Sequence, residues 1–272
     1  MALIKRLLSL LCVCLLCGCG AASSVTQGSA AQPKESGSVP QEQPPLRQEE
    51  QPENAGTQDT APLAGVTICL DAGHGITSAR AQERISPLSE RTKPAYVSGA
   101  SGACQTEEEL NLAVAQLAQQ GLESLGARVI MTRETHEATV SNIERAQIAN
   151  EAHADLCIRI HADGSDQSSP HGLSILIPAG DLLAAPAIAA PSRQAAACML
   201  ETLLDYTDAY DRGLVERTDL TGFNWSEVPC ILLEMGFLSN PEEDARMATQ
   251  EYREKIAGGI VSGVCEWIAE RS

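Results

Sequence analysis

The chain has 272 residues, of which 43% are hydrophobic, enough for one sizeable domain with extensions. A core of that size folds without disulfides or a metal, so stability alone gives no reason to invoke a structural metal ion. The formal net charge is −17, from 19 Lys and Arg against 36 Asp and Glu. Such a charge disfavours nucleic acid as a partner and favours a neutral or cationic target.

The N-terminal segment has the pattern of an export signal. Lys5 and Arg6 form a basic region ahead of an apolar stretch, residues 7–16, that is too short to span a bilayer. Cys19 then follows one hydrophobic and two small residues, which resembles a bacterial lipoprotein signal. We therefore predict a signal peptide over residues 1–18 and a lipid anchor in the membrane at Cys19. An ordinary secretory signal cleaved nearby is the alternative, and both place the protein outside the cytoplasm.

The segment after Cys19 is predicted to be a disordered linker, over residues 19–62. It is rich in Pro, Gln, Ser, Ala and Glu and contains no aromatic residue. Such a composition buries too little apolar surface to offset the entropy lost on ordering. A flexible chain of this length spans roughly 35 to 40 Å on average. The linker would tether a folded domain, predicted over residues 63–272.

Strand-like and helix-like patterns alternate after Ala64. This alternation predicts a single α/β domain with a mainly parallel twisted sheet and helices on both faces. Ser141 and Asn240 have the pattern of helix N-caps, the first in a capping box with Glu144. The predicted strands are 66–70, 128–132, 156–160, 172–177 and 229–233, and the predicted helices are 110–125, 141–152, 192–206 and two that follow residue 240.

Residues 76–104 form a polar insertion with several Pro and Gly residues, directly after the first predicted strand. We expect an ordered surface loop or a mobile flap there. Its position next to a candidate site motivates the hypothesis that it gates that site.

The mature cysteines predict no cysteine-based metal site. Cys69, Cys157 and Cys230 lie inside apolar strand-like runs, where cysteine behaves as a small hydrophobic residue, so we expect buried free thiols. The mature chain contains no Cys-x-x-Cys pair. A disulfide that involves Cys104 or Cys198 is the open alternative.

Three polar residues stand where predicted strands end. His74 closely follows the strand 66–70, His161 follows the strand 156–160, and Glu234 follows the strand that ends at Leu233. In open α/β sheets, ligands bind beyond the carboxyl ends of the strands. We therefore expect these three side chains to meet at one edge of the sheet, although they are far apart in sequence.

Two imidazoles and one carboxylate suit a hydrolytic zinc ion. They leave a coordination position for water, whose pKa the metal lowers toward about 7. A second carboxyl must then take the water proton and pass it to the leaving amine. The acidic cluster of residues 107–109 can supply the ligand, and Glu234, in an apolar setting that raises its pKa, is the candidate acid/base. The same ligands also suit iron or manganese.

Five separated motifs resemble the zinc-dependent N-acetylmuramoyl-L-alanine amidases of the type 3 family. They occur in the family's order: Asp71-Ala72-Gly73-His74-Gly75, a Glu ahead of Leu110-Asn111-Leu112, Met131-Thr132-Arg133, Ile160-His161-Ala162, and Leu233-Glu234-Met235-Gly236-Phe237 with Ser239-Asn240-Pro241. The resemblance implies one zinc ion per chain, bound by His74, Glu107 and His161, with Glu234 as the catalytic acid/base. Glu107 is preferred to Glu108 and Glu109 because it has the spacing of the family's Glu-x-x-x-Asn-Leu pattern.

The resemblance implies a cell-wall hydrolase that acts on peptidoglycan, at the amide between N-acetylmuramic acid and the L-alanine of the stem peptide. Two alternatives stay open: a non-catalytic wall-binding protein with the same fold, and another zinc amidohydrolase such as a carboxypeptidase. Residues 217–225, a polar and aromatic loop, could contact substrate or be an ordinary surface connection. His136, His153 and His171 are weaker ligand candidates because such positions commonly satisfy helix ends or solvent.

Overall fold

The computed structural model describes residues 61–271. The expectations for the signal peptide, for the lipid anchor at Cys19 and for the linker up to residue 60 lie outside these residues. Between residues 61 and 271, no helix is both long enough and apolar enough to cross a membrane.

A six-stranded sheet forms the centre of the domain, with the strand order β4-β1-β5-β8-β6-β7. The pairs β4–β1, β1–β5, β5–β8 and β6–β7 are parallel, and only β6–β8 is antiparallel. This mainly parallel sheet confirms the predicted fold class. The strands are β1 (Thr67–Ala72), β4 (Arg128–Met131), β5 (Leu156–Asp163), β6 (Leu173–Pro178), β7 (Asp211–Arg217) and β8 (Cys230–Phe237).

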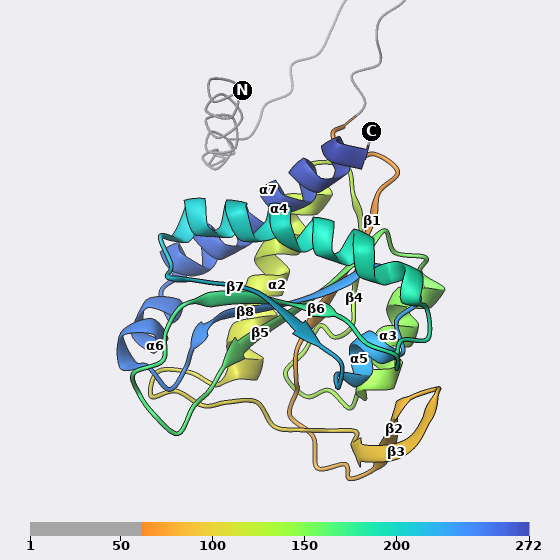
Figure 1. Ribbon diagram of the computed structural model, residues 1–272. Coiled ribbons are helices and arrows are strands. Elements are labelled where there is room, and N and C mark those ends of the chain that lie inside the picture. Colours follow the sequence, from red (N-terminus) through yellow and green to blue (C-terminus); the bar gives the residue numbers. More distant parts are fainter. Residues whose placement is uncertain (1–60, 272) are drawn as a thin grey trace, which may run out of the picture. The chain divides into compact units, whose positions relative to one another are not determined.

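Helices cover both faces of the sheet (Figure 1). One core cluster packs the sheet against α2 (Glu107–Ser124), α4 (Ala189–Thr207) and α7 (Gln250–Arg271). A smaller cluster on the other face includes residues of α3 (Asn142–Glu151) and α5 (Thr221–Asn224). A short 3-10 helix, η1 (Pro186–Ile188), precedes α4, and α6 (Pro241–Met247) follows β8.

Glycines let α7 lie close against α4. A Cβ atom at Gly259 would stand 3.0 Å from the Cα atom of Leu203, and one at Gly263 would stand 2.8 Å from the Cα atom of Met199. Backbone atoms cannot yield as a flexible side chain can, so larger residues here would push the two helices apart. The low helix propensity of glycine is offset by this close packing.

The two helix starts predicted from N-cap patterns are confirmed. The Ser141 hydroxyl accepts from the Glu144 backbone N–H at 3.2 Å, and the Glu144 carboxylate accepts from the Ser141 N–H at 2.7 Å. Asn240 caps α6 through bonds to the N–H groups of residues 242 and 243, with Pro241 in the first turn.

Three elements differ from the expectation. The segment 217–225, which we expected to be a loop, contains the short helix α5. The insertion contains a β-hairpin, β2 (Gln82–Ser86) and β3 (Ser89–Pro94), where we expected a loop. The edge strand β7 was not predicted either. β3 and β7 are largely polar and exposed, and β2 is polar except for Ile85, so the alternation of buried apolar residues that indicates a strand is missing.

The hairpin is bound to the domain rather than isolated from it. The Trp225 indole N–H donates to the carbonyl of Arg84 at 3.0 Å, and the Asn224 amide donates to the carbonyl of Ile85 at 3.0 Å. Part of the segment 217–225 therefore holds the hairpin in place.

The strand cysteines are free and buried, as predicted. Cys157 on β5 is in register with Cys69 on β1 and with Cys230 on β8. Cys104 and Cys198 are also free, so the described residues contain no disulfide.

Candidate metal centre

The loop after β1 presents His74 with an unusual backbone conformation. Its φ is +60°, in the left-handed region that few residues other than glycine adopt. Its Nδ1 atom lies 2.8 Å from the carbonyl oxygen of Val97 in the insertion, a partner for an N–H donor. This contact makes Nδ1 the protonated nitrogen and leaves the lone pair of Nε2 directed at the centre.

His161 reaches the centre from β5, and Gly73 makes room for it. A Cβ atom at position 73 would lie 2.3 Å from the His161 ring. The two imidazole rings of His74 and His161 are edge to face, with centroids 4.9 Å apart. Both His161 and Glu234 lie inside their strands, which continue past the predicted ends at residues 160 and 233.

Glu107, the first residue of α2, lies between the two histidines. Its Oε1 atom is 3.1 Å from Nε2 of His74 and 3.0 Å from Nδ1 of His161. The other carboxylate oxygen accepts from the Ala100 backbone N–H at 2.7 Å. Burial opposes ionisation of Glu107, but the hydrogen bonds to His161 and His74 outweigh it and hold its pKa well below its usual range.

Glu108 and Glu109 lie outside this cluster. The Glu109 carboxylate accepts from the backbone N–H and the hydroxyl of Thr106, at 3.1 and 2.9 Å, and so stabilises the start of α2. The backbone carbonyl of Glu108 accepts from Arg133 at 2.7 Å. Of the three acids at residues 107–109, only Glu107, the one that the family's spacing selects, contacts both histidines.

The donor set fits a metal ion. The candidate ligand atoms of His74, Glu107 and His161 all lie within 4.8 Å of one another. Ligands about 2.0 to 2.2 Å from a tetrahedral zinc ion stand roughly 3.3 to 3.5 Å apart, close to the 3.0 and 3.1 Å found between Glu107 and the two histidines. Imidazole and carboxylate are also the ligands that hydrolytic zinc sites use.

Glu234 lies beside this cluster without being part of it. It is the register partner of His161 across β5 and β8. Its Oε2 atom is buried and has no hydrogen-bond partner among the described residues. Burial, followed by the negative charges of Glu107 and Asp163, raises its pKa well above the usual value. The sequence-based expectation of a buried, isolated carboxyl is consistent with this environment.

A buried ion network, absent from the sequence-based candidates, supports the loop that bears His74. Asp71 on β1 binds Nη1 of Arg145 at 2.6 Å and Nε of Arg159 at 2.7 Å. Arg145 also donates to the carbonyls of Ala72 and His74. The sequence did contain an indication of this network, because Asp71 and Arg159 are charged residues within apolar strands, and such residues need buried partners.

We expect Asp71→Asn to lower the free energy of unfolding by about 3 to 5 kcal/mol, because two buried guanidinium groups lose their shared counter-charge. Arg145 and Arg159 outweigh burial and hold the pKa of Asp71 well below its usual range. Ionised Asp71 therefore contributes its full stabilisation above about pH 3.9, the pKa of an Asp side chain in the unfolded chain. This contribution declines as the pH falls below that value.

Denaturant unfolding from pH 7 to pH 3 tests this expectation. The difference between wild type and Asp71→Asn should stay constant down to about pH 5 and narrow at more acidic pH. Asp219→Asn, which breaks an exposed pair with Arg217, is the control and should cost less than about 1 kcal/mol. Equal costs for the two variants would refute the assigned role of Asp71.

A cleft of about 260 Å³ adjoins the centre. His74, His161 and Glu234 line it together with residues of the insertion and of the segment 217–225. Within that segment, Arg217 and Leu220 face the cleft, while Asn224 and Trp225 contact the hairpin instead. One part of the segment 217–225 therefore lies where it can contact substrate, and the other part serves as a structural connection.

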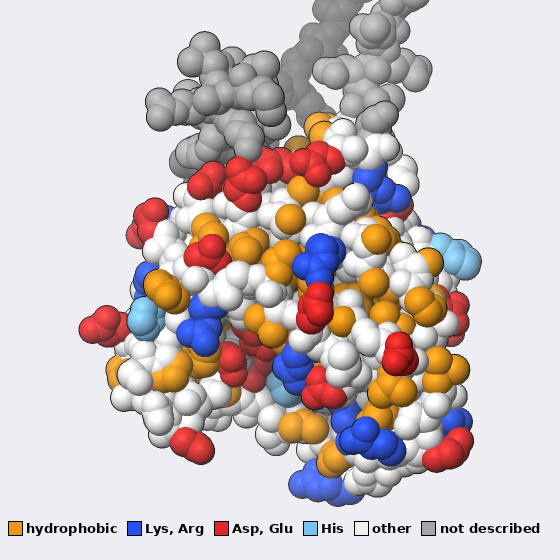
Figure 2. Space-filling model, viewed as in Figure 1, with side chains coloured by type: hydrophobic (Ala, Val, Ile, Leu, Met, Phe, Trp, Pro, Cys, Tyr) orange, Lys and Arg blue, Asp and Glu red, His pale blue; other side chains and the backbone are white. Residues whose placement is uncertain are grey.

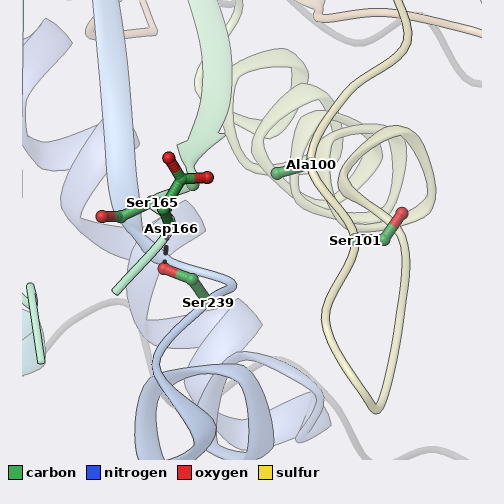
Figure 3. A pocket seen from close by; sticks show the side chains of 6 residues that line it. Ala100, Ser101, Ser165, Asp166 and Ser239 are labelled. Carbon is green, nitrogen blue, oxygen red and sulfur yellow. Dashed lines mark hydrogen bonds between the residues drawn. The ribbon is translucent and has the colours of Figure 1, made fainter. Parts of the chain in front are cut away.

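A second, more open hollow of about 510 Å³ lies next to Glu107's partner Ala100 (Figure 3). Ala100 and Ser101 form one side, and the loops that follow β5 and β8 form the other. These two loops are joined by a hydrogen bond from the Ser165 N–H to the Ser239 hydroxyl at 3.1 Å.

The three weaker histidine candidates lie outside the cluster. His136 uses its backbone carbonyl to bind the N–H of Ile76, and His171 packs its ring against Tyr210. His153 has a left-handed backbone at the end of α3. None of them belongs to the group that could hold a metal ion in residues 61–271.

Fold and site together define a class: an α/β protein with a candidate metal centre and a buried carboxyl at the carboxyl edge of a mainly parallel sheet, an arrangement suited to hydrolysis. Residues 68–266 match the family model described as N-acetylmuramoyl-L-alanine amidase. The chain belongs to this family. The family resemblance and the cell-wall amidase function expected from the sequence are thereby confirmed.

Similar proteins agree with this assignment. The N-acetylmuramoyl-L-alanine amidase Rv3717 of Mycobacterium tuberculosis is 30% identical over 219 residues, which cover 77% of this chain and 89% of that protein. The crystal structure of the amidase Ami1 from Mycobacterium smegmatis has a TM-score of 0.70 and 29% identity, covering 76% of this chain and 99% of that one. Ami1 from Mycobacterium abscessus, in its apo form, has a TM-score of 0.69 and 28% identity.

Proposed function

We propose that residues 63–272 form a zinc-dependent catalytic domain that cleaves the amide between N-acetylmuramic acid and the L-alanine of the peptidoglycan stem peptide. The observation that carries the proposal is the convergence of two imidazoles on one oxygen of Glu107, next to a buried carboxyl on the adjacent strand. Similar proteins named as N-acetylmuramoyl-L-alanine amidases support cleavage of the same amide bond.

In this proposal His74, Glu107 and His161 hold one zinc ion per chain. When bound, zinc supplies a Lewis acid for the scissile carbonyl and lowers the pKa of a water molecule. Val97 and Ala100 hold His74 and Glu107 in position through their backbone groups. Outer contacts of this kind fix the orientation and protonation of metal-binding side chains.

Glu234 is the proton carrier in this proposal. Its carboxyl takes the proton from the attacking water and delivers it to the nitrogen of L-alanine as the amide bond breaks. A raised pKa suits both steps, because the group must hold the proton between them. The unpartnered Oε2 atom is free to accept it.

Mass spectrometry of purified wall, digested with the mature protein, tests the proposed reaction. Intact stem peptides that begin with L-alanine support the amidase. Peptides shortened at their carboxyl end would instead support a carboxypeptidase, and an absence of products would support a non-catalytic wall-binding protein. Metal analysis of protein purified without added metal distinguishes zinc from iron or manganese.

We also propose that the mature chain is a lipoprotein that faces the cell wall, anchored to the bacterial membrane through an acylated Cys19. The support is the spacing of the signal-like N-terminus, and extracytoplasmic action agrees with the cell-wall amidases among its relatives. An unmodified N-terminus in the mass spectrum of the mature, membrane-extracted protein would contradict the anchor.

A further inference from the structure

One side of the cleft is basic although the chain as a whole is strongly acidic. Four cationic side chains line the cleft, and in the described part of the chain Glu234 is its only acidic lining residue. Figure 2 shows several basic side chains over the β2–β3 hairpin, at the lower right of the view. Arg145 and Arg159 share the single carboxylate of Asp71, and Arg217 is paired with Asp219, so four cations face two counter-charges and the lining keeps a net positive charge. Lys93 and Arg217 are the two cations that are not bound to Asp71.

Arg217 is held in a fixed orientation at the end of β7. Its Nε and one Nη atom donate to the two oxygens of Asp219, at 2.9 and 3.0 Å. A guanidinium has five N–H groups, so this bidentate contact uses two and leaves three. Such an arrangement presents a pre-oriented planar donor to the cleft at little further entropic cost.

Lys93 brings a second cation to the same place from the hairpin. It is partly buried on β3 and interacts electrostatically with Arg159, Glu83, Asp219 and Arg217. Asp219 balances one of the two positive charges, so a ligand carboxylate close to both cations would balance the other. The cleft therefore favours an anionic ligand group at this position.

Arg217 and Glu234 line the same cleft, and the positive charge of Arg217 opposes the rise in the pKa of Glu234. The cationic pair is thus near the point where the amide bond breaks, and the substrate peptide extends from that bond. Three apolar side chains, Leu176, Leu220 and Leu232, also line the cleft and carry no charge.

We propose that Lys93 and Arg217 form a carboxylate-binding subsite, which selects stem peptides whose second residue carries a free carboxylate rather than a carboxamide. This inference rests on the proposed function and adds a substrate preference to it. Planar, bidentate recognition by arginine distinguishes the two groups because a carboxamide offers one acceptor oxygen and no charge.

The test compares two soluble substrates, N-acetylmuramoyl-L-alanyl-D-isoglutamate and its D-isoglutamine counterpart, cleaved by the same zinc-loaded protein. We expect wild type to prefer the carboxylate about 10- to 100-fold in kcat/KM, the range of a charge-assisted hydrogen bond. Arg217→Gln should reduce the preference to less than about threefold. Arg217→Lys, which keeps the charge and loses the planar donor, should retain an intermediate preference.

The ratio of the two substrates isolates recognition from catalysis. Any effect of Arg217 on Glu234 changes both rates equally and cancels. Arg193→Gln is the matched control: it removes an exposed cation on α4, paired with Glu216, and should leave the ratio unchanged. Equal cleavage of the two substrates by wild type, or an unchanged ratio in Arg217→Gln, would refute the subsite. Cleavage of neither substrate by wild type would refute the proposed function instead.

Discussion

Glu234→Gln should reduce release of stem peptides from purified wall by about 10²- to 10⁴-fold while the protein still binds zinc. The substitution keeps the size of the side chain and removes its ability to take a proton. Because Glu234 lies beside the cluster and outside the set of candidate ligands, metal content should not change. Rates of peptide release and metal content, measured on the same preparation, check both parts.

Glu227→Gln is a suitable control for this experiment. Glu227 is exposed in the loop that leads into β8, and its backbone N–H, rather than its carboxylate, contacts Asn150. Its loss should leave turnover near that of wild type. Near-normal turnover of Glu234→Gln would remove Glu234 as the proton carrier, and loss of zinc together with activity would indicate that it helps to bind the metal.

Short-range pattern in the sequence was sufficient to predict five of the six strands of the sheet, two helix N-caps and the edge where the site lies. Apolar runs that end in a polar residue predicted β1, β5 and β8, and the rule for parallel strands placed His74, His161 and Glu234 at one edge. In the structure these residues meet Glu107 at the predicted edge of the sheet.

The rest depends on contacts between distant segments. The β2–β3 hairpin is held by Asn224 and Trp225, more than 100 residues away, so its own polar sequence does not indicate strands. The contacts of Val97 and Ala100 with the centre likewise arise only after the insertion folds back on α2. Spacing alone could not reveal which backbone groups orient the candidate ligands.

These contacts bear on the gating hypothesis for the insertion. One part of the segment, at Val97 and Ala100, positions candidate ligands, and another part, the hairpin, rests on α5 and its flanking residue Trp225. The two functions are separable in sequence. Gating therefore stays a hypothesis for the hairpin, whereas a positioning role belongs to residues 97–100.

Glu107→Gln and Glu108→Gln form the sharpest test of the metal centre. The two residues are adjacent on α2 and about 100° apart around its axis, so the substitutions remove the same charge at nearly the same position. Glu107→Gln should weaken zinc binding by at least about 100-fold, more than changes in outer contacts usually cause, and should abolish activity without added zinc. Glu108→Gln should bind zinc as wild type does. Equilibrium dialysis against buffered zinc gives both affinities.

Circular dichroism of the metal-free variants separates ligand loss from misfolding. Glu107 binds the N–H groups of Ala100 and Ala162 in addition to the histidines, so Glu107→Gln could loosen the insertion even if no metal were involved. A folded Glu107→Gln with weakened zinc binding assigns the residue as a ligand. Unchanged zinc affinity in this variant would overturn the assignment, and equal weakening in Glu108→Gln would show that zinc binding reflects only the overall negative charge at the start of α2. Because only Glu107 faces His74 and His161, geometry predicts a clear difference between the two variants.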